Sequence, residues 1–171
     1  MDRYLQRALT AMNEATRDMS EAEMSRAAKG KWSIANIVEH LARAFEATHK
    51  GLRRRLADES PPLPPASLRQ RLFTLVVVEL GQIPNGRKAP ELTLPAGISG
   101  ASALQKFREN LALMDVTIGE CAGRFGREKI GSHPLLGPFS ADQWRRFHWV
   151  HTRHHVRQIL ALRGSSKRNA A

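Results

Sequence analysis

The chain has 171 residues, 42% of them hydrophobic and 25% charged, and this length and composition are ordinary for one globular domain. The net charge of +11 is unusual. Its single cysteine, Cys121, excludes an intramolecular disulfide and suits a reducing compartment. No apolar run approaches the roughly 20 residues of a membrane helix, and the first residues lack an apolar signal segment, so we expect a cytoplasmic protein with no membrane partner.

The positive charge favours anionic partners such as nucleic acid, acidic lipid or small anions. The basic residues are spread along the chain, however, without a nucleic-acid-binding motif and with few aromatic residues among them. We interpret them as a solvated surface and do not expect nucleic acid as a partner. A basic nucleic-acid-binding protein is the alternative.

Three helices are predicted before residue 60. Apolar residues at spacings of three and four over 5–19 predict the first helix. Residues 20–23 form a capping-box pattern, which predicts a short helix up to about Ala28. Ser33 caps a longer helix, whose apolar stripe extends over 34–56.

The middle of the chain is predicted to contain a stiff connection, a short helix and a long loop. The four prolines in 60–65 exclude a helix there. Residues 68–80 follow a capping serine and indicate a helix, although three consecutive valines also allow a strand. Three prolines and four glycines in 81–100 predict a surface loop, and loops of that length often form lids or walls of sites.

Two further long helices complete the prediction. Apolar residues three and four apart over 104–125 are typical of a helix in a bundle. Residues 132–138 are predicted to be a loop. Ser140 begins a capping box at the start of the last helix, which we expect to stop at Gly164.

Four long amphipathic helices, a shorter helix and no convincing strand predict an all-α fold, a four-helix bundle. We expect one domain over residues 1–164 and a flexible basic tail over 165–171. On the last helix, Trp149, Val156 and Leu160 form a second apolar line that a single core does not need. Either the long loop covers this line or it is a homodimer contact.

Histidines suggest a metal site. His151 and His155 are four residues apart on the last helix, on one face and in the middle of its apolar stripe. Two imidazoles placed in this way can bind one ion; alternatively, each is a core histidine satisfied by hydrogen bonds. His40, on the edge of the apolar stripe of the helix over 34–56, is the candidate third ligand or a residue buried at the core boundary.

Three motifs resemble those of the DinB-like superfamily of helical bundles. Lys-Trp-Ser at 31–33, followed by Ile-Val-Glu-His-Leu at 37–41, resembles the motif of its second helix. Residues 146–158 resemble the motif of its last helix, and 133–137 are similar to a branch known chiefly as uncharacterised proteins. The stretch 68–100 has no counterpart that we can place, so the resemblance does not define the pocket walls.

The resemblance implies a four-helix bundle with one divalent metal ion bound by His40, His151 and His155. Three protein ligands leave positions for water or substrate, and imidazoles suit Zn²⁺, Ni²⁺ or Fe²⁺ without choosing among them. The superfamily contains hydrolases and transferases that use low-molecular-weight thiols, which implies a small-molecule substrate and one of these two classes. A non-catalytic metal-binding or stress-related protein is the alternative, and no catalytic side chain can be named.

Other side chains are candidates for supporting roles. Gln158, one turn beyond the histidine pair, is a candidate to support a ligand or to line the pocket. His148 and His154 are alternative ligands, and His133 is expected to order the loop before the last helix. Glu39 is adjacent in sequence to a candidate ligand and could act as a base, but helical spacing predicts that it points outward.

Overall fold

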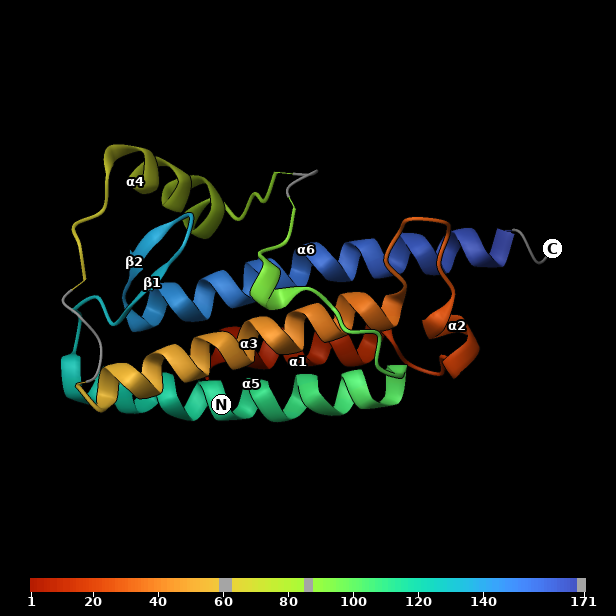
Figure 1. Ribbon diagram of the computed structural model, residues 1–171, viewed down its shortest axis with the longest axis horizontal. Helices are drawn as coiled ribbons and strands as arrows, with labels where there is room; N and C mark the ends of the chain where they lie inside the picture. The colour runs from red at the N-terminus through yellow and green to blue at the C-terminus, as the bar shows by residue number, and fades with distance from the viewer. Residues whose placement is uncertain (59–62, 85–87, 169–171) are drawn as a thin grey trace.

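The computed structural model describes residues 1–58, 63–84 and 88–168, except for the side chains of 165–168. Within this part of the chain, four long helices lie side by side along the longest axis of the molecule (Figure 1). They are α1 (Arg3–Ala15), α3 (Ile34–Leu56), α5 (Gly100–Phe125) and α6 (Ala141–Arg168). Helix α3 packs along α5, α1 packs along α6, and the two pairs contact each other. The predominantly helical fold predicted from the sequence is confirmed.

Serine side chains define where several helices begin. Ser33 accepts a hydrogen bond from the backbone of Asn36 at the start of α3, and the Asn36 side chain bonds back to the cap. The capping box at Ser20 starts α2 (Glu21–Ser25), as predicted. This helix ends earlier than expected because Arg26 already has an extended backbone conformation.

The core lies between the four long helices, where the predicted apolar stripes meet. Phe45 of α3 and Phe107 of α5 pack with their ring centroids 5.1 Å apart. The largest fully buried side chains come from all four helices and from the segment between α5 and α6: Leu5, Met12, Leu41, Phe45, Leu52, Phe107, Leu111, Met114, Ile118, Ile130, Phe139 and Ile159. Cys121 is buried among them as a free thiol.

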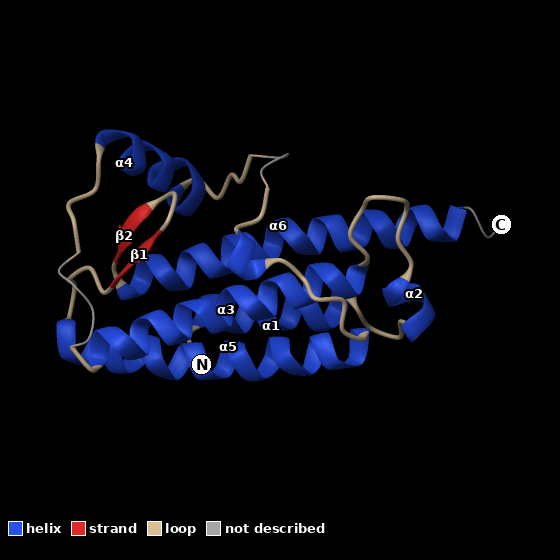
Figure 2. Ribbon diagram, in the orientation of Figure 1, coloured by secondary structure: helices blue, strands red, loops and turns tan. Residues whose placement is uncertain are grey.

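A two-stranded antiparallel hairpin precedes α6, so the prediction of a loop without strands is wrong (Figure 2). Strand β1 (Gly131–His133) pairs with β2 (Gly137–Phe139). Gly137 has φ +80°, which allows the chain to reverse between the strands. The hairpin is stabilised by its apolar residues, because Ile130 and Phe139 are fully buried against the helices. A three-residue strand is too short to show an alternating pattern in the sequence.

Between α3 and α5 the chain forms one short helical unit and a long irregular segment. Helix α4 (Leu68–Thr74) continues into a π-helical turn, η1 (Leu75–Glu79). The helix predicted for this segment is therefore confirmed, and the alternative strand is wrong. Beyond Gly81, which has φ +68°, the described residues are irregular except for the 3₁₀ turn η2 (Glu91–Thr93). The predicted connection 60–65 lies partly outside the described residues.

Helix α6 passes through Gly164 and extends to Arg168, so its predicted end is wrong. A glycine within a helix costs only about 1 kcal/mol, which neighbouring helical residues can offset. The second apolar line on α6 does not form one exposed face: Val156 is buried, Trp149 packs partly against the core, and Leu160 is half exposed. A homodimer contact therefore stays a prediction. No helix in the described ranges is long and apolar enough to span a membrane.

Candidate metal centre

Helices α3 and α6 bring three histidines together. His151 and His155 lie one turn apart on α6, as their spacing requires. His40 comes from α3, where it is buried against the ring of Trp32 at a centroid distance of 5.1 Å. His155 is also buried, whereas His151 is half-buried. The structure thus places together the three histidines that the sequence and the resemblance select.

The Nε2 atoms of the three rings face one another. His151 Nε2 lies 3.3 Å from His40 Nε2 and 3.1 Å from His155 Nε2. All three ligand atoms lie within 4.8 Å of one another. Bonds of 2.0–2.1 Å at tetrahedral angles place two ligand nitrogens about 3.3 Å apart. The two distances from His151 therefore match the spacing of ligand nitrogens around one small divalent ion.

Hydrogen bonds to the opposite ring nitrogens fix the direction of two of these imidazoles. His40 Nδ1 lies 2.9 Å from the carbonyl oxygen of Thr93, and His155 Nδ1 lies 2.8 Å from Gln158 Oε1. A carbonyl oxygen only accepts, so each Nδ1 carries the proton and each neutral ring presents a bare Nε2. This is the arrangement by which proteins orient histidine ligands to metals. His151 Nδ1 is buried and has no hydrogen-bond partner among the described residues.

Burial keeps the three imidazoles neutral at neutral pH. It lowers the pKa of His40, against the opposing effect of the hydrogen bond to Thr93. Burial, followed by the neighbouring His155 and His40, lowers the pKa of His151 well below its ordinary value. Burial and the proximity of His40 lower the pKa of His155 to about 3. Neutral rings keep the lone pairs that a cation needs, so the site is electrostatically prepared for a metal ion.

The remaining histidines of the prediction lie outside the cluster. His148 is buried one turn before His151, and its Nε2 hydrogen-bonds to Thr48 Oγ1 at 3.0 Å. His154 is half-buried and lies 3.2 Å from the amide nitrogen of Gln158. Neither is brought to the three Nε2 atoms, whereas Gln158 contacts His155 directly and has the supporting position that the sequence suggests.

His133 orders the turn of the hairpin. Its Nδ1 accepts hydrogen bonds from the backbone N–H groups of Leu135 and Leu136, both at 3.2 Å. Burial lowers the pKa of His133 to about 4, which keeps this nitrogen free to accept. The role expected from the sequence therefore matches the contacts.

Glu39 does not point outward, and the prediction for this residue is wrong. Only 3% of its surface is exposed, because the segment before α5 covers it. Its carboxylate accepts hydrogen bonds from the backbone N–H groups of Ala96, Gly97 and Ile98 at 2.8, 2.9 and 3.2 Å. Burial by itself raises the pKa of Glu39, but these three donors and Arg43 outweigh it and lower the pKa below its usual value.

The sequence does carry a signal for this arrangement. Gly97 has φ +87°, and a glycine in a proline-containing loop indicates a sharp turn that exposes consecutive N–H groups. An isolated loop pattern does not show which carboxylate these groups meet, because the partner lies 57 residues away in the sequence.

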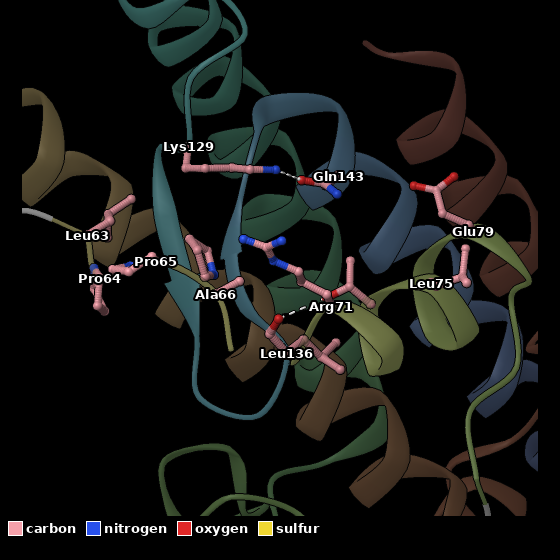
Figure 3. Close-up of a pocket in the computed structure, with 12 residues that line it drawn as sticks. Leu63, Pro64, Pro65, Ala66, Arg71, Leu75, Glu79, Lys129, Leu136 and Gln143 are labelled. Carbon is pink, nitrogen blue, oxygen red and sulfur yellow. Dashed lines mark hydrogen bonds between the residues drawn. The ribbon is translucent and has the colours of Figure 1, made fainter. Parts of the chain in front are cut away.

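A separate surface groove of about 530 Å³ lies between α4, the hairpin and the start of α6. Figure 3 shows Lys129 hydrogen-bonded to Gln143 on one side and Arg71 extending toward them from α4. None of the three clustered histidines lines this groove. We therefore do not assign the histidine chemistry to it.

The fold and the cluster define a helical protein with a buried three-histidine site of the kind that could bind a divalent metal ion. A family profile described as "Protein of unknown function (DUF1569)" matches residues 2–161. The chain belongs to this family. A search of curated proteins and a search of solved structures gave no match.

Proposed function

We propose that the protein is a DinB-like four-helix bundle that binds one divalent metal ion through His40, His151 and His155. The observation that carries the proposal is the convergence of three Nε2 atoms, with His151 Nε2 3.3 and 3.1 Å from the other two. Two bare imidazole nitrogens, those of His40 and His155, facing a third at these distances in a buried space are unfavourable unless the three share a proton or a cation. Zn²⁺, Ni²⁺ and Fe²⁺ all suit such a donor set.

We further propose that the bound ion serves catalysis in a metal-dependent hydrolase or a transferase that uses a low-molecular-weight thiol. When bound, the ion would supply Lewis acidity toward a water, a thiol or a substrate oxygen. The chain itself holds the ligands neutral, directs two of them through Thr93 and Gln158, and keeps the site partly dry with Trp32 and Phe147. These are the conditions in which a metal ion polarises its ligands most strongly.

The ligand number favours catalysis over a purely structural role. A structural zinc site has four protein ligands, whereas a catalytic one keeps a position open. In the described part of the chain, the cluster contains three ligand residues, and His148, an alternative ligand suggested by the sequence, is bonded to Thr48. A non-catalytic metal-binding protein would need a further ligand from elsewhere.

The test is elemental analysis of the purified protein beside the double variant His151→Ala/His155→Ala. The wild type should contain about one equivalent of metal per chain, and the double variant should lose it. His154→Ala is the matched control, since this residue is on the same helix but outside the cluster. Equal metal content in the wild type and the double variant, or none in either after growth with added metal, would refute the proposal.

The reaction class is tested on the metal-loaded protein. Hydrolysis of an activated ester by the wild type and not by the double variant supports the hydrolase. Consumption of a low-molecular-weight thiol in the presence of an electrophile supports the transferase. Neither activity, with metal fully bound, leaves the non-catalytic role.

A further inference from the structure

One helical turn of α3 holds the segment that precedes α5. Figure 1 shows this segment crossing over α3 on its way from η2 to α5. Glu39 accepts from the three consecutive N–H groups of 96–98, and the Arg43 Nε donates to the carbonyl of Leu92 at 3.4 Å. Arg43 also lies 3.8 Å from the Glu39 carboxylate. The segment is therefore attached to α3 at both of its ends.

The same segment provides the hydrogen-bond acceptor for His40. The carbonyl of Thr93 lies between the two attachment points, and it is the group that holds the Nδ1 proton of His40. Thr93 is itself fixed, because its hydroxyl donates to the carbonyl of Pro90 at 2.9 Å. The position of this carbonyl is thus set by contacts on both sides. Both contacts involve a charged side chain, but the buried carboxylate accepts three hydrogen bonds of 2.8 to 3.2 Å, whereas the partly exposed Arg43 donates one of 3.4 Å.

We propose that Glu39 is a positioning residue for the metal ligand His40 and acts through the segment 93–98. By fixing these backbone groups, Glu39 places the Thr93 carbonyl where it selects the Nδ1–H form of His40 and aims the bare Nε2 at His151 and His155. The inference rests on the proposed metal site for its effect on affinity. Its effect on the His40 ring is independent of any metal.

Glu39 contacts none of the three ligand nitrogens, so a purely structural role must be told apart from positioning. A carboxylate that only anchors a loop would, when replaced, loosen the whole protein and either leave the rings unchanged or affect His40 and His155 alike. A positioning carboxylate would change His40 alone. His155 is the internal reference, because Gln158 from its own helix holds it, and the hydrogen bonds of Gln158 within the described residues go to His154 and His155.

The experiment compares the full-length wild type with Glu39→Gln. The amide is nearly the same size but replaces one accepting oxygen by a donor, which faces backbone N–H groups and repels them. Glu46→Gln is the matched control: it removes a carboxylate from the same helix, one that is paired with Lys50 on the exposed surface. Zn²⁺ is titrated into each metal-free protein in competition with a chromophoric chelator, and ¹⁵N NMR of the histidine rings reports the tautomer of His40 and of His155.

We expect the dissociation constant of Glu39→Gln for Zn²⁺ to rise about 10-fold or more, the range that loss of a group supporting a ligand produces. His40 should change from the Nδ1–H form to a mixture of tautomers, while His155 keeps its form and Glu46→Gln behaves as the wild type. Unchanged affinity with an unchanged His40 tautomer overturns the proposal. Equal changes at His40 and His155 overturn it as well, because they indicate general loosening.

Two outcomes need a separate readout. If Glu39→Gln does not fold, hydrogen exchange in the wild type is measured instead. Zinc should slow the exchange of the backbone N–H groups of 96–98, because coupling between His40 and the segment is reciprocal. No slowing at full zinc occupancy overturns the proposal. If the wild type binds no zinc, the proposed metal site is refuted for this ion. The role of Glu39 in positioning the His40 ring is then still decided by the tautomer comparison in the metal-free proteins.

Discussion

Replacing His148 should reduce the loss of unfolding free energy that the protein suffers when the pH falls. This ring is only 1% exposed, and burial, with a smaller effect of His133, lowers its pKa from 6.5 to about 3. The unfolded chain binds a proton at His148 below pH 6.5, while the folded chain does not until about pH 3. The stabilisation is therefore complete above the unfolded pKa and is lost as the pH falls.

At about pH 4.5, two units below the ordinary value, this difference removes about 3 kcal/mol from the free energy of unfolding. That is a large part of the 5–15 kcal/mol that stabilises a typical domain. The assay is urea unfolding of the chelator-treated wild type and of His148→Gln, followed by circular dichroism at about pH 7.5 and pH 4.5. The glutamine keeps a polar group beside Thr48 but cannot bind the proton.

The wild type should lose about 3 kcal/mol more than His148→Gln between the two pH values, because every other titrating group is common to both proteins. The same loss in both proteins would show that His148 does not remain neutral in the folded state, and the reasoning from burial would be refuted.

Other parts of the structure give predictions that do not depend on His148. Gln158→Leu should raise the dissociation constant for Zn²⁺ by about 10- to 100-fold, because His155 loses the acceptor of its Nδ1 proton; chelator competition measures this, and no change would contradict the tautomer assignment. Two glycines of α5 should respond in opposite directions to alanine. Gly119→Ala should stabilise by about 0.5–1 kcal/mol, since an added Cβ meets nothing within 4 Å, whereas Gly100→Ala should destabilise because its Cβ would lie 2.6 Å from the sulfur of Met24. Thermal unfolding separates the two, and a shift of the same sign in both would contradict the packing.

The histidine pair on α6 was predictable because its geometry is local. A spacing of four on an apolar helix face fixes the relative position of two side chains without knowledge of the rest of the fold. The position of His40 depends on how α3 packs against α6, which periodicity does not determine; here the family resemblance supplied what the residue pattern left open.

Two of the errors share a physical cause, because each concerns a contact with a distant part of the chain; the third concerns a weak local signal. Glu39 was expected at the surface because spacing along α3 describes the helix and not the segment that covers it. The hairpin before α6 was missed because three-residue strands are stabilised by burial of Phe139 and not by their own pattern. Helix α6 continues past Gly164 although glycine there usually marks an end.

The distance in sequence between the ligands has a consequence for synthesis. His40 and His151 are 111 residues apart, so the donor set is incomplete until α6 has been made and has docked on α3. Closing a loop of that length costs entropy that an ion bound by one imidazole does not repay. Under the proposed function, a growing chain would therefore have little means to capture an ion early, and metal uptake would be the last event of folding, reporting that the final helix is in place.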